Sequence, residues 1–486
     1  MIEKEFNKWN LGGVCSTKGS VYFSVGCLPF FCLSSLTGKG GQQGVGAAVL
    51  IGSLRFKEVF MGQEAIAGII FVAMYAVIVS EKIHRTIIAM VGAILMIVTG
   101  IMTQETAIHH VDFNTLGLLI GMMIIVAITS KTGLFNFIAV WAAKKAKADP
   151  VNLLVYLSLI TAVCSAFLDN VTTVLLMVPV TFSITTKLHV DVMPYLLAQV
   201  IASNIGGTAT LIGDPPNIMI GSAVKELTFA AFIENLAIIS IINLILVTAI
   251  FVLLYRKHLT TKPELKTLVM QENEWEELKD IPLLRKCLFV LGLVILMFFL
   301  HSLTGLESSL IAIAGAFLLL LLVGKEEFVE HAMHGVEWPT IFFFIGLFIA
   351  VGGLVETGVI RDLAVQGVNL TGGDVTKTSM LVLWMSAIVS AFLDNIPFVA
   401  TMIPLIQDMG AMGVSNLEPV WWSLALGACL GGNGTIIGAS ANVVLSDISA
   451  KHGHAITFMQ YLKIGFPMMV MSVAIAAIYL VMRFPA

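Results

Sequence analysis

Two aspartates stand in apolar surroundings where an ionised side chain is costly. Asp169 lies in CSAFLDNVTTVLLMVP and Asp394 in VSAFLDNIPFVATMIP. A carboxylate buried in lipid costs several kcal/mol unless it is paired, hydrated or protonated, so both residues are predicted to be functional. The adjacent Asn170 and Asn395 add hard oxygen ligands of the kind that small cations prefer. The aspartates would also cap the helices that follow them, and capping is compatible with ion binding.

Two glycine segments, SNIGGTATLIGDPPN and ACLGGNGTIIGASAN, interrupt apolar stretches. In the first, Pro215 and Pro216 cannot continue a helix, so the helix must break there. Irregular backbone at membrane depth is tolerated only inside protein or beside a cavity, which predicts a binding loop in each half. Close helix packing would explain the paired glycines but not the two prolines. Asp214 has Ala439 as its counterpart, so the two sites are not expected to be equivalent.

The predicted site combines these elements. The candidate residues for ion or substrate binding are Asp169, Asn170, Thr172, Gly206, Gly207, Thr208, Thr210, Asp214, Asn217, Asp394, Asn395, Gly431, Gly432, Asn433, Thr435 and Asn442. Among them, the candidate sodium ligands are Asp169, Asn170, Asp394 and Asn395. No catalytic residue and no cofactor are predicted, apart from sodium or a proton as the coupling ion.

The elements that must position this site are duplicated. SAFLDN occurs at 165–170 and again at 390–395, and the glycine segments at 206–217 and 431–442 keep the same offset of 225 residues. One register held across separate elements indicates a duplicated chain. The predicted parts are an N-terminal segment, a first repeat, a cytoplasmic linker, a second repeat and a tail, at 1–61, 62–255, 256–286, 287–480 and 481–486.

Composition and charge place the repeats in a membrane. Hydrophobic residues make up 58% of the 486 residues and charged residues 12%, and the net charge of -4 gives no basic field for nucleic acid. Lysines and arginines alternate between loops as the positive-inside rule requires, most clearly in the first half. Each half has five predicted crossings, an odd number, so the second half is inverted. We expect an all-α polytopic protein of the cell membrane with inverted repeats, re-entrant hairpins and broken helices.

Other features are predicted to be less specific. Residues 21–36 are predicted to be a signal-like apolar region or, as we prefer, an additional retained span, and residues 37–46 a flexible connector. Asp112 and Glu337 are predicted helix-start caps. The histidines His109, His110, His331 and His334 are expected in solvated loops.

From about residue 62 to 486 the chain resembles the ion transporter superfamily. This group contains arsenite permeases, D-type sodium/proton antiporters, citrate and dicarboxylate carriers and the pink-eyed dilution (P) protein. SAFLDNVTTVLLMVPVT, NIGGTATLIGDPPNIMIGS and GACLGGNGTIIGASANVVLSDIS are most similar to the P-protein branch. The resemblance implies a scaffold, a transport domain with an elevator-like motion, and a homodimer. Dicarboxylate carriers have Ser-Asn-Thr at the hairpin tips, and the aspartates here would repel a dicarboxylate.

The prediction is therefore a secondary transporter coupled to sodium or protons, and not an enzyme. Arsenite or antimonite efflux is the first alternative, because Asn and Thr can hydrogen-bond a neutral oxyacid. That alternative would imply an ATPase subunit, since the chain has no GxxxxGK[ST] motif. A citrate or dicarboxylate carrier and an anion channel are further alternatives. An intramembrane aspartyl hydrolase would need Asp169 and Asp394 to share a proton.

Overall fold

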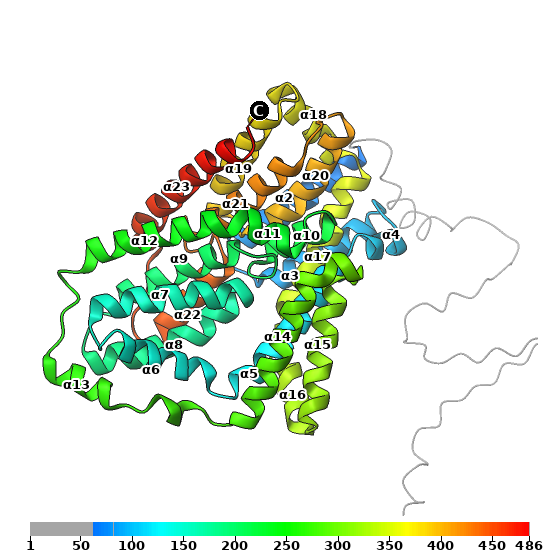
Figure 1. Cartoon of the computed structure of the whole chain (residues 1–486). Helices are drawn as coiled ribbons and strands as arrows, with labels where there is room; N and C mark the ends of the chain where they lie inside the picture. Colours follow the sequence, from blue (N-terminus) through cyan, green and yellow to red (C-terminus); the bar gives the residue numbers. More distant parts are fainter. Residues whose placement is uncertain (1–61, 81, 486) are drawn as a thin grey trace, which may run out of the picture. The chain divides into compact units, whose positions relative to one another are not determined.

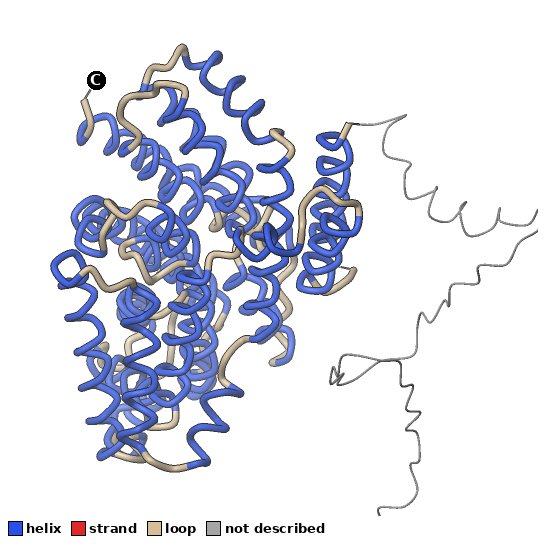
Figure 2. The backbone as a smooth tube through the Cα atoms, turned by 90° about the vertical axis from the view of Figure 1, so that its right-hand side faces the viewer, coloured by secondary structure: helices blue, strands red, loops and turns tan. Residues whose placement is uncertain are grey.

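The structure is a computed structural model that describes residues 62–80 and 82–485. All regular elements of these residues are helices (Figure 2). Eight of the described helices are long and apolar enough to cross a membrane. These observations confirm the predicted all-α polytopic fold. The span predicted at 21–36 and the connector at 37–46 lie outside the described residues and stay predictions.

The first repeat runs from α2 to α12 (Figure 1). Its helices are α2 (Gln63–Val79), α3 (Arg85–Val98), α4 (Gln104–His109), α5 (Phe113–Ser130), α6 (Leu134–Lys145), α7 (Pro150–Phe167), α8 (Asn170–Leu188), α9 (Met193–Thr208), α10 (Pro215–Ala223), α11 (Phe229–Phe232) and α12 (Ile238–Tyr255). A π-helical turn, Ile233–Ala237, joins the last two.

The second repeat runs from α14 to α23. Its helices are α14 (Ile281–Thr304), α15 (Ser308–Val323), α16 (Glu326–His334), α17 (Trp338–Glu356), α18 (Val359–Thr371), α19 (Val375–Phe392), α20 (Asn395–Ala411), α21 (Glu418–Gly431), α22 (Ser440–Lys451) and α23 (Phe458–Arg483). Helices α5, α7, α8 and α10 begin 225 residues before α17, α19, α20 and α22. The offset seen in the sequence is thus also the offset of the helices.

Two helix pairs join the repeats crosswise, and we call α3, α5, α15 and α17 the scaffold helices. α5 packs on α15, and α3 packs on α17. A Cβ added to Gly121 would lie 2.5 Å from the backbone carbon of Ala312, and one added to Gly346 would lie 2.6 Å from that of Ala89. Gly121 and Gly346 are repeat counterparts, so each half supplies the glycine for one close crossing.

The SAFLDN segments form two hairpins, α7–α8 and α19–α20. α7 ends at Phe167, Leu168 is extended, and Asp169 caps α8 by accepting a hydrogen bond from the amide of Thr172 at 2.8 Å. In the second hairpin, Asp394 caps α20 by accepting from the amide of Ile396 at 3.2 Å. Each aspartate therefore lies at a hairpin tip, as predicted.

The linker between the repeats contains α13 (Pro263–Gln271) and a 3₁₀ turn at Glu274–Glu277. α13 packs against α6 and α8 (Figure 1). Three ion pairs join this linker to the first repeat, namely Lys144–Glu274, Lys187–Glu272 and Lys266–Asp149. The linker is therefore held against the first repeat, and its cytoplasmic location stays a prediction.

Candidate functional site

In the first repeat, the hairpin and the glycine segment are hydrogen-bonded to each other. The Ser165 hydroxyl donates to the Ser203 carbonyl at 2.7 Å, and the Thr210 hydroxyl donates to the Ala166 carbonyl. The second repeat has the same two bonds at the counterpart positions, from Ser390 to Ala428 at 2.7 Å and from Thr435 to Ala391 at 2.5 Å. Each tip is therefore fixed against the broken helix of its own half.

The asparagines at the ends of the glycine segments stabilise the backbone of these segments. Asn217 donates to the carbonyl of Thr210 at 2.9 Å. Its counterpart Asn442 donates to the carbonyls of Thr435 at 2.8 Å and of Gly432 at 2.7 Å. Because these amide donors are committed to backbone carbonyls, they stabilise the irregular backbone that the broken helices require.

The paired glycines allow close backbone contact, as the alternative prediction of close helix packing requires. A Cβ on Gly206 would lie 2.1 Å from the carbonyl oxygen of Ala162, and one on Gly431 would lie 2.6 Å from that of Ala387. Gly207 and Gly432 approach the following loop residues in the same way. The Thr208 hydroxyl bonds back within its helix to the Asn204 carbonyl at 2.7 Å. These residues position the site through the backbone.

A small cavity of about 20 Å³ lies between the two hairpin tips. A cavity of this size holds roughly one water molecule or one bare ion. Its lining residues are Arg85, Leu119, Met123, Asp169, Asn170, Val171, Asp214, Pro215, Glu337, Thr340, Asn395, Ile396 and Ser440. Both repeats thus contribute to one central cavity, and the scaffold helices α3, α5 and α17 close it from one side.

Asp214 and Asn395 connect the two repeats at this cavity. The Asn395 amide reaches the two carboxylate oxygens of Asp214 at 3.3 and 3.5 Å, and the Asp214 side chain is fully buried. Asn395 therefore contacts the glycine segment of the other half, although its hairpin is bonded to the glycine segment of its own half. The contact crosses over because the inverted halves bring the tip of α20 against the start of α10.

A chain of amides continues from the first tip. Asn170 donates to Asn204 at 3.1 Å, and Asn204 donates to Asn433 at 2.9 Å and to Asn442 at 3.0 Å. Asn204 was not among the predicted site residues, although it stands two positions before the paired glycines. The amide nitrogen of Asn433 is buried and lacks a protein partner among the described residues. Asn204 therefore links the first tip to the glycine loop of the other repeat.

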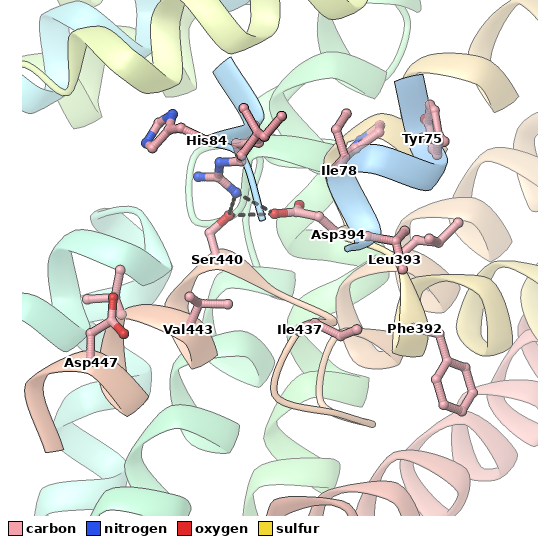
Figure 3. Close-up of a pocket in the computed structure, with 15 residues that line it drawn as sticks. Tyr75, Ile78, His84, Phe392, Leu393, Asp394, Ile437, Ser440, Val443 and Asp447 are labelled. Carbon is pink, nitrogen blue, oxygen red and sulfur yellow. Dashed lines mark hydrogen bonds and ion pairs between the residues drawn. The ribbon is translucent and has the colours of Figure 1, made fainter. Parts of the chain in front are cut away.

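Asp394 is paired with Arg85 of the scaffold helix α3, which was not among the predicted site residues. The Arg85 guanidinium lies 2.7 Å from one Asp394 oxygen, and the Ser440 hydroxyl donates to that oxygen at 2.7 Å (Figure 3). The Arg85 guanidinium also lies 5.1 Å from the ring centre of Phe343 in α17. Asp394 borders a second cavity of about 420 Å³, which is also lined by Tyr75 of α2 and Asp447 of α22 (Figure 3).

Asp169 differs from Asp394 in its partners. Its two oxygens accept from the amide and the hydroxyl of Thr172 at 2.8 and 2.5 Å. No described lysine, arginine or histidine forms an ion pair with it. Asp169 and Asp394 bond to different groups, so they do not form the proton-sharing pair that an aspartyl hydrolase needs.

The two predicted helix caps have different roles. Asp112 caps α5, accepting from the amides of Asn114 at 3.0 Å and Thr115 at 3.2 Å, and it also accepts from the Ser222 hydroxyl at 2.9 Å. Glu337 does not cap α17 through its side chain. Instead it accepts from the Thr340 hydroxyl at 3.1 Å and lines the central cavity. Both residues occupy the N-cap position of a helix, as predicted, but only Asp112 caps its helix through its side chain.

The histidines lie at helices rather than in loops. His109 ends α4, and His331 and His334 belong to α16. His110 pairs with Glu356 at 2.9 Å beside a third cavity, of about 460 Å³, that also reaches Asp112. This third cavity lies at the start of α5, whereas the second cavity lies at the start of α3.

Three comparisons with known proteins agree with one another. A protein family described as citrate transporter matches residues 75–427. An uncharacterized transporter of Mycobacterium bovis is 42% identical over 425 residues, covering 86% of this chain and 98% of that protein. The P protein of Sus scrofa is 37% identical over 500 residues, covering 86% of this chain and 59% of that protein.

A solved structure supports the fold. The chain is similar to the YdaH transporter of Alcanivorax borkumensis, whose crystal structure is described as having an unusual topology. The TM-score is 0.51 at 14% sequence identity, over 77% of this chain and 86% of that one.

Proposed function

The chain belongs to the citrate transporter family, and from that premise we propose that it is a secondary transporter whose coupling cation, sodium or a proton, binds between the two hairpin tips. The resemblance to the ion transporter superfamily is confirmed by the family match and by the P-protein relatives. The chain is a multi-pass integral membrane protein and a transporter, not an enzyme, as predicted.

The proposal is carried by the cavity that Asp214 and Asn395 close between the repeats. The cavity has room for about one water or ion, and its charged lining residues are three carboxylates, Asp169, Asp214 and Glu337, and one guanidinium, Arg85. Negative charges that outnumber positive ones at a buried site favour a bound cation or proton. Amide oxygens of the tip asparagines would complete the ligand set.

The proposed motion is elevator-like. The hairpins and broken helices pack closely with each other, because α7 packs on α9, α19 on α21, and α8 on α22. We name these helices, with α10 and α20, the transport bundle. Two larger cavities lie between the transport bundle and the scaffold helices, one at the start of α3 and the other at the start of α5. Sliding of the transport bundle along the scaffold would open the central cavity to one side and then to the other. A homodimer is part of the proposal through the family resemblance alone.

An organic acid carrier is the second candidate function, and one observation favours it. Both tip aspartates were expected to repel a dicarboxylate substrate, but Arg85 neutralises Asp394. The neighbouring cavity of about 420 Å³ is within the size range of small-molecule sites. A substrate carboxylate could therefore approach this tip without facing an unpaired charge. Arsenite efflux has no comparable observation in its favour.

The test is transport by the purified chain in proteoliposomes. Sodium and proton gradients are imposed separately, and uptake of citrate and of arsenite is measured alongside the cation flux. The proposal expects a sodium- or proton-driven flux that falls strongly in Asp214→Asn. Citrate uptake driven by the same gradient would identify the second candidate as the substrate class. Arsenite transport that is independent of both gradients would overturn the proposal.

A further inference from the structure

The two hairpin tips have equivalent backbones, but their aspartates have different partners. Asp169 and Asp394 are repeat counterparts, and both cap the second helix of a hairpin. The residue 225 positions after Arg85 is Leu310, and the residue 225 positions before Ser440 is Pro215. The partners that hold Asp394 therefore have no equivalents at Asp169.

The oxygens of Asp394 are occupied. One accepts from the Ile396 amide, and the other accepts from both Arg85 and Ser440 at 2.7 Å. Hydrogen bonds between charged groups are short and strong, and this distance lies in that range. The Asp394 side chain is 12% exposed and that of Arg85 30%, so the pair is shielded from water on most sides. A guanidinium thus stands where a free cation would bind the second tip.

From this asymmetry we propose that Arg85 is a built-in cation that neutralises the second hairpin tip, so that the chain carries one coupling cation although its symmetry offers two tip sites. The inference rests on the proposed function and adds to it the number of cations and the residue that sets this number. The transported cation binds at the Asp169 and Asp214 side of the central cavity.

Arg85 and Asp394 belong to different parts of the protein. Arg85 begins α3, which is a scaffold helix, and its guanidinium lies over Phe343 of another scaffold helix. Asp394 and Ser440 belong to the transport bundle. The ion pair therefore joins the scaffold to the transport bundle, and Arg85 takes the place of a cation at the second tip.

The experiment replaces Arg85 by the residue of its counterpart position. In proteoliposomes of the full chain, the initial flux is measured against sodium concentration at fixed pH, and against pH at fixed sodium concentration. We expect the wild-type flux to depend on the driving cation with a Hill coefficient of about 1, and that of Arg85→Leu to rise toward about 2, because Asp394 then needs a cation of its own. Arg85→Lys keeps the charge and should stay first order.

A double variant is the control for loss of folding. Arg85→Leu combined with Asp394→Asn removes both charges, so it should be folded, active and again first order. An Arg85→Leu protein that remains first order would overturn the inference. So would a double variant that is folded but inactive, because Arg85 would then do more than neutralise Asp394. If the wild-type protein responds to neither cation, the proposed function itself fails, which is a separate outcome.

Discussion

Asn395 of the second repeat donates its side-chain amide to Asp214 of the first, with distances of 3.3 and 3.5 Å to the two carboxylate oxygens. This contact closes the central cavity and joins the two halves at the point where their broken elements meet. Asp214 has no acidic counterpart, since Ala439 stands at the equivalent position. The site is therefore one shared asymmetric cavity rather than two equal ones.

Asp214→Asn should reduce cation-driven flux without unfolding the protein. The substitution keeps the shape of the side chain but removes the charge that we assign to cation binding. A hydrogen bond to a charged group is worth about 1.5 to 3 kcal/mol, which corresponds to roughly a ten- to hundredfold loss. The measurement is the initial flux in proteoliposomes. Asp362→Asn is the matched control, because Asp362 is exposed in α18 and lines none of the three cavities, so the flux should be nearly unchanged.

Asn204→Leu should destabilise the transport bundle. Leucine is close in size to asparagine, but it leaves Asn170, Asn433 and Asn442 without their shared partner in a buried place. Unsatisfied buried polar groups cost about 1 to 3 kcal/mol each, so we expect a loss of roughly 2 to 4 kcal/mol after relaxation. Thermal unfolding in detergent measures it. Asn152→Leu changes an exposed asparagine and should have little effect, and equal melting temperatures for both variants would contradict the amide chain.

Gly121→Ala should loosen the crossing of α5 and α15. The added Cβ would lie 2.5 Å from the backbone of Ala312, which cannot move as a flexible side chain can. Overpacking of this kind costs about 1 to 3 kcal/mol, and Gly346→Ala should behave alike at the counterpart crossing. Gly292→Ala is the control, because nothing lies within 4 Å of its added Cβ. There, alanine should be neutral or stabilising, since it favours helix by about 1 kcal/mol.

The attachment of the linker to the first repeat should depend on pH through Asp149. Burial acts to raise the pKa of Asp149, but the hydrogen bond from Lys266, the amides of Asn152 and Val151 and the Lys266 charge lower the pKa below its usual value. A lowered folded-state pKa stabilises the protein above the unfolded value of about 3.9, and this stabilisation is lost as pH falls through the folded value. The contribution is below about 1 kcal/mol, because the pair is one-third exposed.

Lys266→Met tests this linkage. Its melting temperature should lie slightly below that of the wild-type protein at neutral pH, and the difference should shrink as the pH approaches that of carboxylate protonation. Amide hydrogen exchange in α13 should rise in the variant at neutral pH, because α13 carries Lys266. A difference that grows on acidification would contradict the assignment.

The sequence predicted the hairpins, the broken helices and the tip residues because each is encoded locally. An aspartate beside an extended residue caps a helix wherever it stands, and the prolines at 215 and 216 must interrupt a helix. The duplicated register predicted two equivalent halves, and the odd number of crossings in each half predicted the inverted arrangement. Many of the candidate residues, such as Asn217 and Thr435, turned out to bind the backbone of the loops.

The sequence could not predict contacts between distant parts of the chain. Arg85 and Asp394 are 309 residues apart, and no local pattern links them. Glu337 resembles a helix cap in sequence, and only the packing of α17 against the transport bundle turns its side chain to the cavity. The sequence carried one signal of the asymmetric site, namely the differences between repeat counterparts. Arg85 against Leu310 and Asp214 against Ala439 are charge differences between the halves, and both lie at the central site.

The most direct test of the central claim is ion binding by the purified protein without transport. Radioactive sodium bound at equilibrium and protons released into weakly buffered solution are measured together, for the wild-type chain and for Asp214→Asn. We predict that the wild-type protein binds sodium or releases protons in response to it, and that Asp214→Asn loses this response while keeping its melting temperature. An unchanged response in Asp214→Asn, or none in the wild-type protein, would contradict a cation site between the hairpin tips.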